Sequence, residues 1–383
     1  MSALASELDG IDLGDRRLNR RARRVVAKLG EKPTLSIPAA CGGWRETRAA
    51  YRLFDHAAVT AEAVLAPHIA CTVERMGAHP RVLCIEDTSE LDYTGRPSMQ
   101  GLGPLNLETR QGLYLHPTLA LTPERLCLGL LGVHRWVRAP GSLGQDKDPN
   151  RPLEEKESVR WVDGYRQVDE LAEQLPNTRL TYVADREADL YDLFVEAPCP
   201  AAAADWLVRG QHDRVLANGK TLRQHLGETA VLTKTTFERP ASHGCKARTV
   251  HQDIRVVRIT LPAPRRPDRT LPEVEITALL ASEPHPPAGE EPVDWLLLTN
   301  LPVETPEQAI EKLSWYLCRW QIEVYFRILK SGCRIEKLQL ERLQRLEPAL
   351  AFYMIVAWRV LFLTMLGREC PEMPCDVVFE TAE

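Results

Sequence analysis

The sequence has 383 residues, of which 44% are hydrophobic and 26% are charged, and its formal net charge is −5. A chain of this length and composition can build one large domain or two to three ordinary domains with a proper core. The negative net charge argues against a protein that coats DNA over its whole surface.

The sequence contains no apolar run of about 18 to 20 residues, and its N-terminus lacks the apolar region of a secretory signal. We therefore expect no membrane span and a cytoplasmic protein. The ten cysteines are scattered, without a C-x-x-C motif or a Cys/His cluster at zinc spacing, which indicates reduced structural thiols.

Residues 1 to about 60 are predicted to be helical, with a break at 31–43 and a second helix at 44–56. Within this region, residues 15–28 carry six Arg and one Lys against one Asp. Such a block can follow a phosphate backbone, or it can be a solvated helix face. Composition alone leaves both interpretations open.

The next part of the chain reads as a mixed α/β fold. Strands are predicted at 82–85, where an apolar run enters an acidic turn at Asp87, and at 112–122 and 126–137. A helix is predicted at 154–175, and a further strand, 179–184, leads directly into Asp185 and a helix. Residues 205–298 then alternate strand-like stretches with Pro-rich turns, which predicts a β-rich insertion.

A polar stripe is predicted on the helix-forming segment 316–330. Tyr316, Arg319, Glu323 and Lys330 fall within an arc of about 60° on a regular helix, whereas apolar residues occupy most of the remaining surface. The stripe can bind a ligand, or it can reflect an ion pair between Arg319 and Glu323 one turn apart.

Three carboxylates are candidates for one metal site: Asp87, Asp185 and Glu323. Sites in open α/β sheets lie at the carboxyl ends of strands, where both aspartates are predicted. Hard oxygen ligands without His or Cys favour Mg²⁺ or Mn²⁺, and a pair of such ions supports phosphodiester cleavage or transfer. The alternative for each aspartate is a turn or a helix N-cap.

The quartet fits the pattern Tyr-x2-Arg-x3-Glu-x6-Lys, and on this ground the chain resembles a group of DDE transposases from bacterial insertion sequences, family four. This group includes the transposase of the composite kanamycin-resistance transposon. The similarity extends to the segments around Asp87 and Asp185, to 154–158 and 294–305, and to the N-terminal basic block with "AAYRLF". It covers nearly the whole chain.

The resemblance implies an RNase H-like catalytic core with a β-rich insertion and an N-terminal helical DNA-binding module. The implied triad is Asp87, Asp185 and Glu323, binding two Mg²⁺ ions with Mn²⁺ as a substitute. The implied reaction sequence is strand hydrolysis at a transposon end, hairpin formation, hairpin opening and strand transfer. The implied partners are the terminal inverted repeats, target DNA and a second copy of the chain in a homodimer, in a bacterial cytoplasm on the nucleoid.

The resemblance also implies DNA contacts by Tyr316, Arg319 and Lys330, and a flipped base stacked on Trp295. For Trp295 the alternative is a core tryptophan on a strand. Arg186 and Arg209 match phosphate-holding positions. The N-terminal arginines implied to bind the inverted repeat are Arg16, Arg17, Arg20, Arg21, Arg23 and Arg24.

The expected domains are a DNA-end-binding module at 1–65, the first part of the core at 66–204, the insertion at 205–300 and the C-terminal core helices at 301–383. The family usually continues into a C-terminal dimerisation region, most of which we expect to be missing after Glu383. Two alternatives therefore stay open. One is a truncated transposase that binds ends and inhibits transposition, and the other is a stand-alone RNase H-like nuclease.

Overall fold

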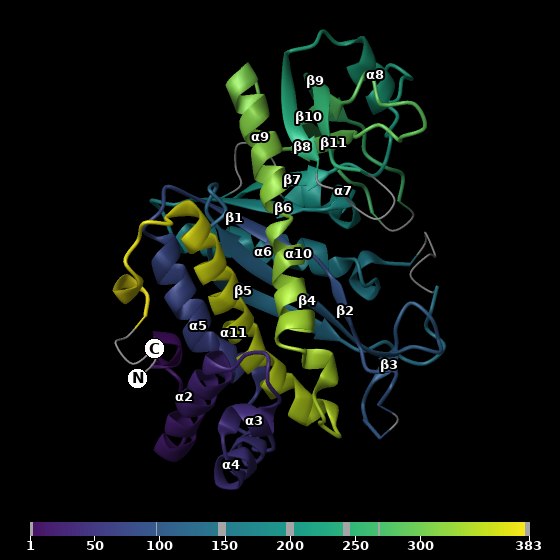
Figure 1. Cartoon of the computed structure of the whole chain (residues 1–383). Helices are drawn as coiled ribbons and strands as arrows, with labels where there is room; N and C mark the ends of the chain where they lie inside the picture. Colours follow the sequence, from purple (N-terminus) through teal and green to yellow (C-terminus); the bar gives the residue numbers. More distant parts are fainter. Residues whose placement is uncertain are drawn as a thin grey trace. The chain divides into compact units, whose positions relative to one another are not determined.

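The computed structural model describes residues 3–96, 98–144, 151–196, 203–239, 246–266 and 269–379. The chain forms two compact units (Figure 1). Unit 1 combines Met1–Pro149 with Trp320–Glu383, and unit 2 is Asn150–Arg319. This division differs from the expected boundaries at 65, 204 and 300, because the N-terminal helices and the C-terminal helices share one unit.

Unit 1 consists of a sheet and the helices that pack on it. Its helices and strands are α1 (Ala3–Ser6), α2 (Arg16–Glu31), α3 (Ile37–Cys41), α4 (Trp44–Phe54), α5 (Ala61–Met76), β1 (Arg81–Glu86), β2 (Ser89–Asp92), β3 (Gly103–Pro104), β4 (Gln111–Leu121), β5 (Cys127–Trp136), α10 (Gln321–Arg327) and α11 (Leu343–Glu369). Strand β4 is central and pairs antiparallel with β1, β2, β3 and β5. The strands predicted around 82–85, 112–122 and 126–137 are confirmed.

The long helix α11 forms much of the core of unit 1, and it contacts α2, α4, α5 and β5 (Figure 1). In the described part of the chain it is also the one helix that is long and apolar enough to cross a membrane, with a mean hydropathy of 2.0 in its most apolar window. An apolar run of this length was not expected. Because 67% of that window is buried inside the protein, as in a core helix, the expectation of no membrane span stays a prediction.

A buried polar cluster ties the N-terminal segment to the rest of unit 1. His68 Nδ1 donates to Glu7 at 2.6 Å, His68 Nε2 accepts from the Leu130 amide at 3.1 Å, and the Arg75 guanidinium bonds the same carboxylate. Burial opposes ionisation of Glu7, but the bonds from His68 and Arg75 outweigh it and lower its pKa. Burial lowers the pKa of His68, consistent with a neutral ring that accepts an amide proton.

The N-terminal helices follow the predicted pattern with one correction. Helix α2 begins after Asp15, whose carboxylate accepts from the Arg17 amide, and it buries Val25, Val26 and Leu29. Helix α4 confirms the second predicted helix. The predicted break at 31–43 is wrong in part, because the short helix α3 forms there with Pro38 in its first turn.

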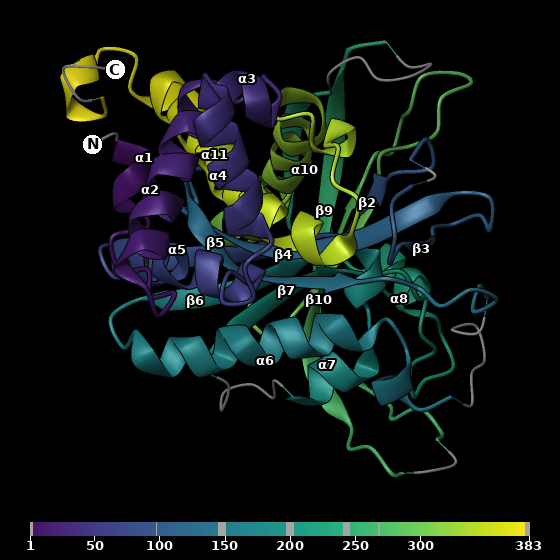
Figure 2. The same cartoon turned by 90° about the horizontal axis from the view of Figure 1, so that it is seen from below.

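Unit 2 contains a mixed sheet with helices beside it. Its elements are α6 (Val159–Gln174), β6 (Arg179–Ala184), α7 (Tyr191–Glu196), β7 (Asp205–Arg209), α8 (Leu222–Glu228), β8 (Thr233–Arg239), β9 (Arg248–Leu261), β10 (Val274–Ser282), β11 (Trp295–Thr299) and α9 (Pro306–Cys318). The strand order is β6-β7-β11-β10-β9-β8, with β6 and β7 parallel and the other pairs antiparallel. Helices α6 and α7 lie side by side beside these strands (Figure 2).

The predicted β-rich region is confirmed by β8 to β11, but β7 does not stand apart from β6. Residues Thr181–Ala184 of β6 pair in register with Asp205–Val208 of β7. The expected boundary at 204 therefore falls between two paired strands.

The segment predicted as one helix at 316–330 is interrupted in two places. Helix α9 begins with a capping box formed by Thr305 and Gln308 and ends at Cys318. Helix α10 begins at Gln321 and passes into a π-helical turn at Ile328–Gly332. A regular 3.6-residue period therefore does not hold as far as Lys330.

The cysteines in the described part of the chain are all free. Six are buried or half-buried, and Cys370 and Cys375 are exposed. This agrees with the expectation of reduced thiols for those eight. Cys199 and Cys245 lie outside the described residues.

Candidate active site

In unit 2, Asp185 has polar neighbours that come from distant parts of the chain. It follows β6 directly at the N-cap position of a short 3₁₀ turn, but its side chain makes no capping hydrogen bond. The Tyr316 hydroxyl donates to Asp185 Oδ1 at 3.3 Å. The guanidinium groups of Arg319 and Arg209 lie 3.8 and 3.9 Å from the carboxylate. The N-cap alternative for Asp185 therefore does not explain its side chain.

These neighbours make the Asp185 site electropositive and partly closed. Tyr316 and Arg319 are buried, with exposed fractions of 1% and 4%, whereas the Asp185 side chain is 26% exposed. Burial and the negative charge of Asp185 raise the pKa of Tyr316, and the two arginines oppose this only in part. Tyr316 thus remains a neutral hydrogen-bond donor at physiological pH.

In unit 1, Asp87 and Glu323 are both accessible to solvent. Asp87 follows β1, is half-buried, and accepts a hydrogen bond from the Thr88 amide at 2.8 Å. Glu323 lies in the first turn of α10 and is exposed.

Lys330, the last member of the polar stripe, has partners within unit 1. Its Nζ donates to the Glu90 carbonyl at 2.8 Å and lies 3.5 Å from Glu336. These contacts join β2 to the segment that follows α10. The role of Lys330 as a phosphate ligand stays a prediction.

A buried network that was not predicted involves the residues on both sides of Asp87. His116 Nε2 lies 3.1 Å from Glu86 Oε2, and His116 Nδ1 lies 3.0 Å from the Thr88 hydroxyl. The Thr118 hydroxyl donates to the other oxygen of Glu86. Glu86 and Thr88, the two neighbours of Asp87 in the sequence, are thus both held by the same histidine. A strand with two buried polar residues in an otherwise apolar sequence, as in "YLHPTLAL", is the signal that could have revealed it.

Trp295 is only 5% exposed, and its ring stacks on Phe237 with centroids 5.2 Å apart. It also lies at a tilt beside Tyr316, at 6.4 Å. In this structure Trp295 is therefore a core tryptophan on a strand, which was the alternative to base stacking. Stacking of a flipped base on Trp295 stays a prediction, and it requires Phe237 to move.

The remaining predicted phosphate ligands differ in exposure. Arg186 is exposed in the turn after Asp185, and Arg209 is half-buried at the end of β7. Arg209 thus already faces the carboxylate, whereas Arg186 projects into solvent.

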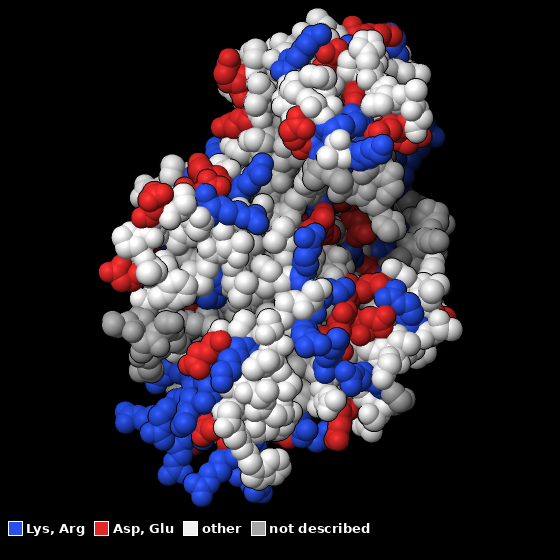
Figure 3. Space-filling model, viewed as in Figure 1, with Lys and Arg blue, Asp and Glu red and all other residues white. Residues whose placement is uncertain are grey.

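The six N-terminal arginines fall into two groups. Arg21 and Arg23 form ion pairs with Glu46 and Asp9, at 3.0 and 3.1 Å. The exposed members are Arg16, Arg17, Arg20 and Arg24, and of these Arg24 also forms an ion pair with Glu46 at 3.3 Å. The exposed face of α4, which was not among the predicted sites, adds Trp44, Arg45, Arg48 and Arg52. Basic side chains gather over α2 and α4 (Figure 3).

The donor set fits a hard divalent cation in chemical type, because Asp87, Asp185 and Glu323 offer carboxylate oxygens that solvent can reach. Asp87 and Glu323 belong to unit 1 and Asp185 to unit 2. Among the residues that the structure describes, no group of three His, Cys, Asp or Glu side chains is arranged to hold a metal ion.

Comparison with known proteins gives two family matches. Residues 162–359 match the family model described as "Transposase DDE domain", and residues 1–59 match the one described as "Transposase DNA-binding". The first match includes Asp185 and Glu323, whereas Asp87 lies between the two.

One similar solved structure is the piggyBac transposase in a synaptic complex with hairpin DNA. The sequence identity is 9% and the TM-score is 0.37. The match covers 78% of this chain and 50% of the piggyBac chain, so this chain spans about half the length of that protein.

Proposed function

The chain belongs to the transposase DDE domain family, and from this premise we propose that it is a cut-and-paste DNA transposase with an RNase H-like core. The observation that carries the proposal is the convergence of Tyr316, Arg319 and Arg209 on Asp185. Tyr316 and Arg319 belong to the Tyr-x2-Arg-x3-Glu-x6-Lys pattern, and both lie more than a hundred residues from Asp185 in the sequence. The spacing Tyr-x2-Arg-x3-Glu-x6-Lys supports assignment to the insertion-sequence group named above.

We assign the catalytic roles to Asp87, Asp185 and Glu323. These carboxylates would hold divalent cations, Mg²⁺ or Mn²⁺, whose chemistry when bound is to stabilise negative charge on a phosphodiester under in-line attack. Arg209 and Arg319 would bind phosphate oxygens of the strand that is cut, by charge-assisted hydrogen bonds. Tyr316 orients Asp185 through its hydroxyl.

DNA ends would bind to the basic face of α2 and α4. Exposed arginines on both helices can contact phosphates, and each neutralised phosphate steepens the dependence of affinity on salt. Arg21 instead joins α2 to α4 through its ion pair with Glu46, and Arg23 joins α2 to Asp9 in the turn that precedes it. This division predicts that substitution of Arg20 affects DNA affinity more than it affects folding. We further propose that the chain acts as a homodimer on two ends.

The test is a denaturing-gel assay with purified protein, Mg²⁺ or Mn²⁺, and linear DNA that carries the native flanks of this gene. We expect a metal-dependent nick that matures into a hairpin. Glu323→Gln should abolish cleavage and leave end binding nearly unchanged. The matched control is Glu307→Gln, an exposed glutamate in the first turn of α9, which should cut normally.

Two outcomes would favour the alternatives. Tight end binding by the wild type without any cut would indicate an end-binding inhibitor. Cleavage without preference for the flanks would indicate a stand-alone nuclease. An equal loss of binding and cleavage in Glu323→Gln would exclude a metal-ligand role for that residue.

Trp295 is tested separately. We expect Trp295→Ala to nick normally and to form few hairpins, because stacking is worth about 1 to 3 kcal/mol per base. The matched variant is Phe237→Leu, which uncovers the indole ring and should preserve hairpins. An unchanged hairpin yield in Trp295→Ala would remove the stacking role.

A further inference from the structure

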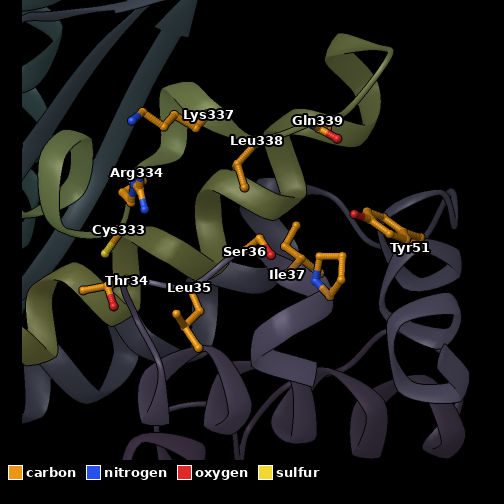
Figure 4. A pocket seen from close by; sticks show the side chains of 11 residues that line it. Thr34, Leu35, Ser36, Ile37, Tyr51, Cys333, Arg334, Lys337, Leu338 and Gln339 are labelled. Atoms are coloured by element: carbon orange, nitrogen blue, oxygen red, sulfur yellow. The ribbon is translucent and has the colours of Figure 1, made fainter. Parts of the chain in front are cut away.

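A cavity of about 330 Å³ lies in unit 1 between the N-terminal helices and the segment that follows α10. Side chains from both parts of the chain surround it (Figure 4). Residues 34–38 and 51 line it from the first part, and residues 333–334 and 337–339 line it from the second. The first six fall in the match to the transposase DNA-binding model, and the last five in the match to the DDE domain.

The lining combines apolar surface with positive charge. Leu35 is 43% exposed, an unusual exposure for a large apolar side chain, and Leu338 and the Tyr51 ring lie around the same space. Arg334 and Lys337 are both exposed. The lining contains no acidic residue. A ligand that fits this lining has an apolar ring and a negative group.

The backbone holds Arg334 in a special conformation. Its φ is +55°, in the left-handed region that non-glycine residues rarely adopt. Such strain is often found at binding sites, where the surrounding structure fixes it. Within the described part of the chain, no ion pair is formed by Arg334 or by Lys337, so both charges are available to an anion.

A second observation is a buried hydroxyl near Cys333 and Tyr51, although the residue that carries it does not itself line the cavity. Tyr353 on α11 is fully buried, and its hydroxyl has no hydrogen-bond partner among the described residues. Burial raises its pKa, and so do the nearby Cys333, Cys41 and Tyr51, of which Cys333 and Tyr51 line the cavity. A buried donor without an acceptor is costly unless something pairs with it.

We propose that this cavity receives one unpaired nucleotide of the DNA end, with its base against Leu35, Tyr51 and Leu338 and its phosphate on Arg334 and Lys337. The volume lies at the lower end of the range for small-ligand sites, about 300 to 1,000 Å³, which admits one nucleotide and excludes a duplex. Contact with an aromatic and apolar wall offsets the cost of removing a base from the stack. The inference rests on the proposed function, because it requires that the chain binds DNA ends.

The cavity would thus be a second nucleotide site, separate from Trp295. Its walls come from the N-terminal helices and from the segment behind the signature helix, so an occupied cavity would join these two parts of unit 1 through the DNA. Occupancy of this site would thus couple binding of the correct DNA end to the part of the chain that follows α10.

The first experiment is a scan of abasic sites along the native flanking DNA, with affinity measured for each duplex. For the wild type we expect one position at which loss of the base weakens binding about tenfold. Leu35→Trp fills the cavity from a side chain that is already exposed, and it should reduce this effect to less than twofold. Leu107→Trp, at another exposed leucine of unit 1, should keep the full tenfold effect.

The second experiment tests the charges. Arg334→Asn with Lys337→Gln removes two positive charges, and asparagine tolerates the left-handed backbone. The two side chains would neutralise one phosphate, so the magnitude of the slope of log K against log[salt] should fall by about 0.9. The matched control is Arg125→Asn with Arg368→Gln, because Arg125 is also exposed with φ of +74° and Arg368 is exposed at the end of α11. Its slope should not change.

The possible outcomes separate this inference from the proposed function. Normal binding and cleavage with a flat abasic scan would overturn the inference alone. A sensitive position that stays equally sensitive in Leu35→Trp would place the base elsewhere and would also overturn it. No binding of the flanks by the wild type would overturn both.

Discussion

Asp87 and Asp185 each follow a buried strand, yet the protein holds the two carboxylates by different means. Near Asp87, the adjoining residues Glu86 and Thr88 are fixed by His116 in a buried network. Near Asp185, the side chain itself is contacted by a hydroxyl and faced by two guanidinium groups from other elements. The Asp87 carboxylate accepts from the amide of its neighbour Thr88, whereas the Asp185 carboxylate is contacted by side chains from distant parts of the chain.

This difference predicts different consequences for substitutions at the two places. Disruption of the network beside Asp87 leaves buried polar atoms without partners, which lowers stability. Disruption around Asp185 affects a site that is partly open to solvent, so stability changes little and chemistry changes more.

The largest expected effect is that of Asp185→Asn on cleavage. Removal of one carboxylate charge from the proposed metal-binding triad should lower the rate of flank cleavage about a thousandfold or more. The free energy of unfolding should change by less than about 1 kcal/mol, because the side chain is partly exposed and its charged neighbours are nearly 4 Å away. Gel assays and urea titrations measure the two quantities, and a cleavage rate within tenfold of wild type would contradict the assignment.

The next effect is that of His116→Phe on stability. The substitution deprives buried Glu86 of one partner and the Thr88 hydroxyl of another, so the free energy of unfolding should fall by about 2 to 3 kcal/mol. His251→Phe is the control, because His251 is exposed and its ring bonds to Thr236 on a neighbouring strand. The free energy of unfolding of this control should fall by less than about 0.5 kcal/mol. Equal urea midpoints for the two variants would remove the distinction between the two carboxylates.

A smaller effect is expected for Tyr316→Phe. The variant loses the hydroxyl that donates to Asp185 and keeps the ring beside Trp295, so the fold should be preserved. Loss of a bond that orients a metal ligand typically lowers metal affinity or activity about 10- to 100-fold, and we expect the lower end. Titration of cleavage against Mg²⁺ should show a higher requirement for the ion. If the dependence on Mg²⁺ is unchanged, Tyr316 does not position Asp185.

The smallest effect is a pH dependence. The pKa of Tyr316 in the folded protein is raised above its ordinary value of 10.0, first by burial and then by Asp185. The unfolded chain therefore releases this proton first, and the stability contribution that is complete below about pH 10 is lost as the pH rises above it. As the pH rises, the free energy of unfolding of Tyr316→Phe should therefore fall less steeply than that of the wild type, by at most about 1.4 kcal/mol per pH unit. Urea titrations of the wild type and of Tyr316→Phe at several values between about pH 9 and pH 11 test this. Parallel plots of the free energy of unfolding against pH for the two proteins would contradict it.

The sequence was a sound guide to the strands that lead into the two aspartates. Residues 82–85 and 180–184 are apolar runs that end at a charged residue, and this pattern is typical of buried strands whose ends reach the surface. The basic N-terminal helix could also be predicted, because Val25, Val26 and Leu29 recur with helical spacing.

The polar stripe shows the limit of periodicity. Positions on a helical wheel assume a constant 3.6 residues per turn, but the π turn at Ile328–Gly332 changes the phase before Lys330 is reached. Lys330 accordingly binds Glu90 and Glu336 in unit 1. Periodicity contains no information about such a turn.

Other parts of the candidate site depend on contacts between distant residues. Nothing in the local sequence of Arg209 shows that it faces Asp185, or that Phe237 covers the ring of Trp295. These pairs are set by the pairing of β7 with β6 and of β8 with β9, and a single sequence does not reveal which strands become neighbours.

The division of unit 1 between the two ends of the chain has a consequence for biosynthesis. The ribosome makes α2, α4 and α5 first, but α11, on which they pack, follows roughly 270 residues later, about 13 to 50 seconds at ordinary rates of bacterial and eukaryotic translation. During that interval the basic helices have an apolar face without its partner. A nascent chain would therefore complete its DNA-binding surface only when synthesis is almost finished, so that an interrupted translation product would be a substrate for proteases before it could occupy a DNA end.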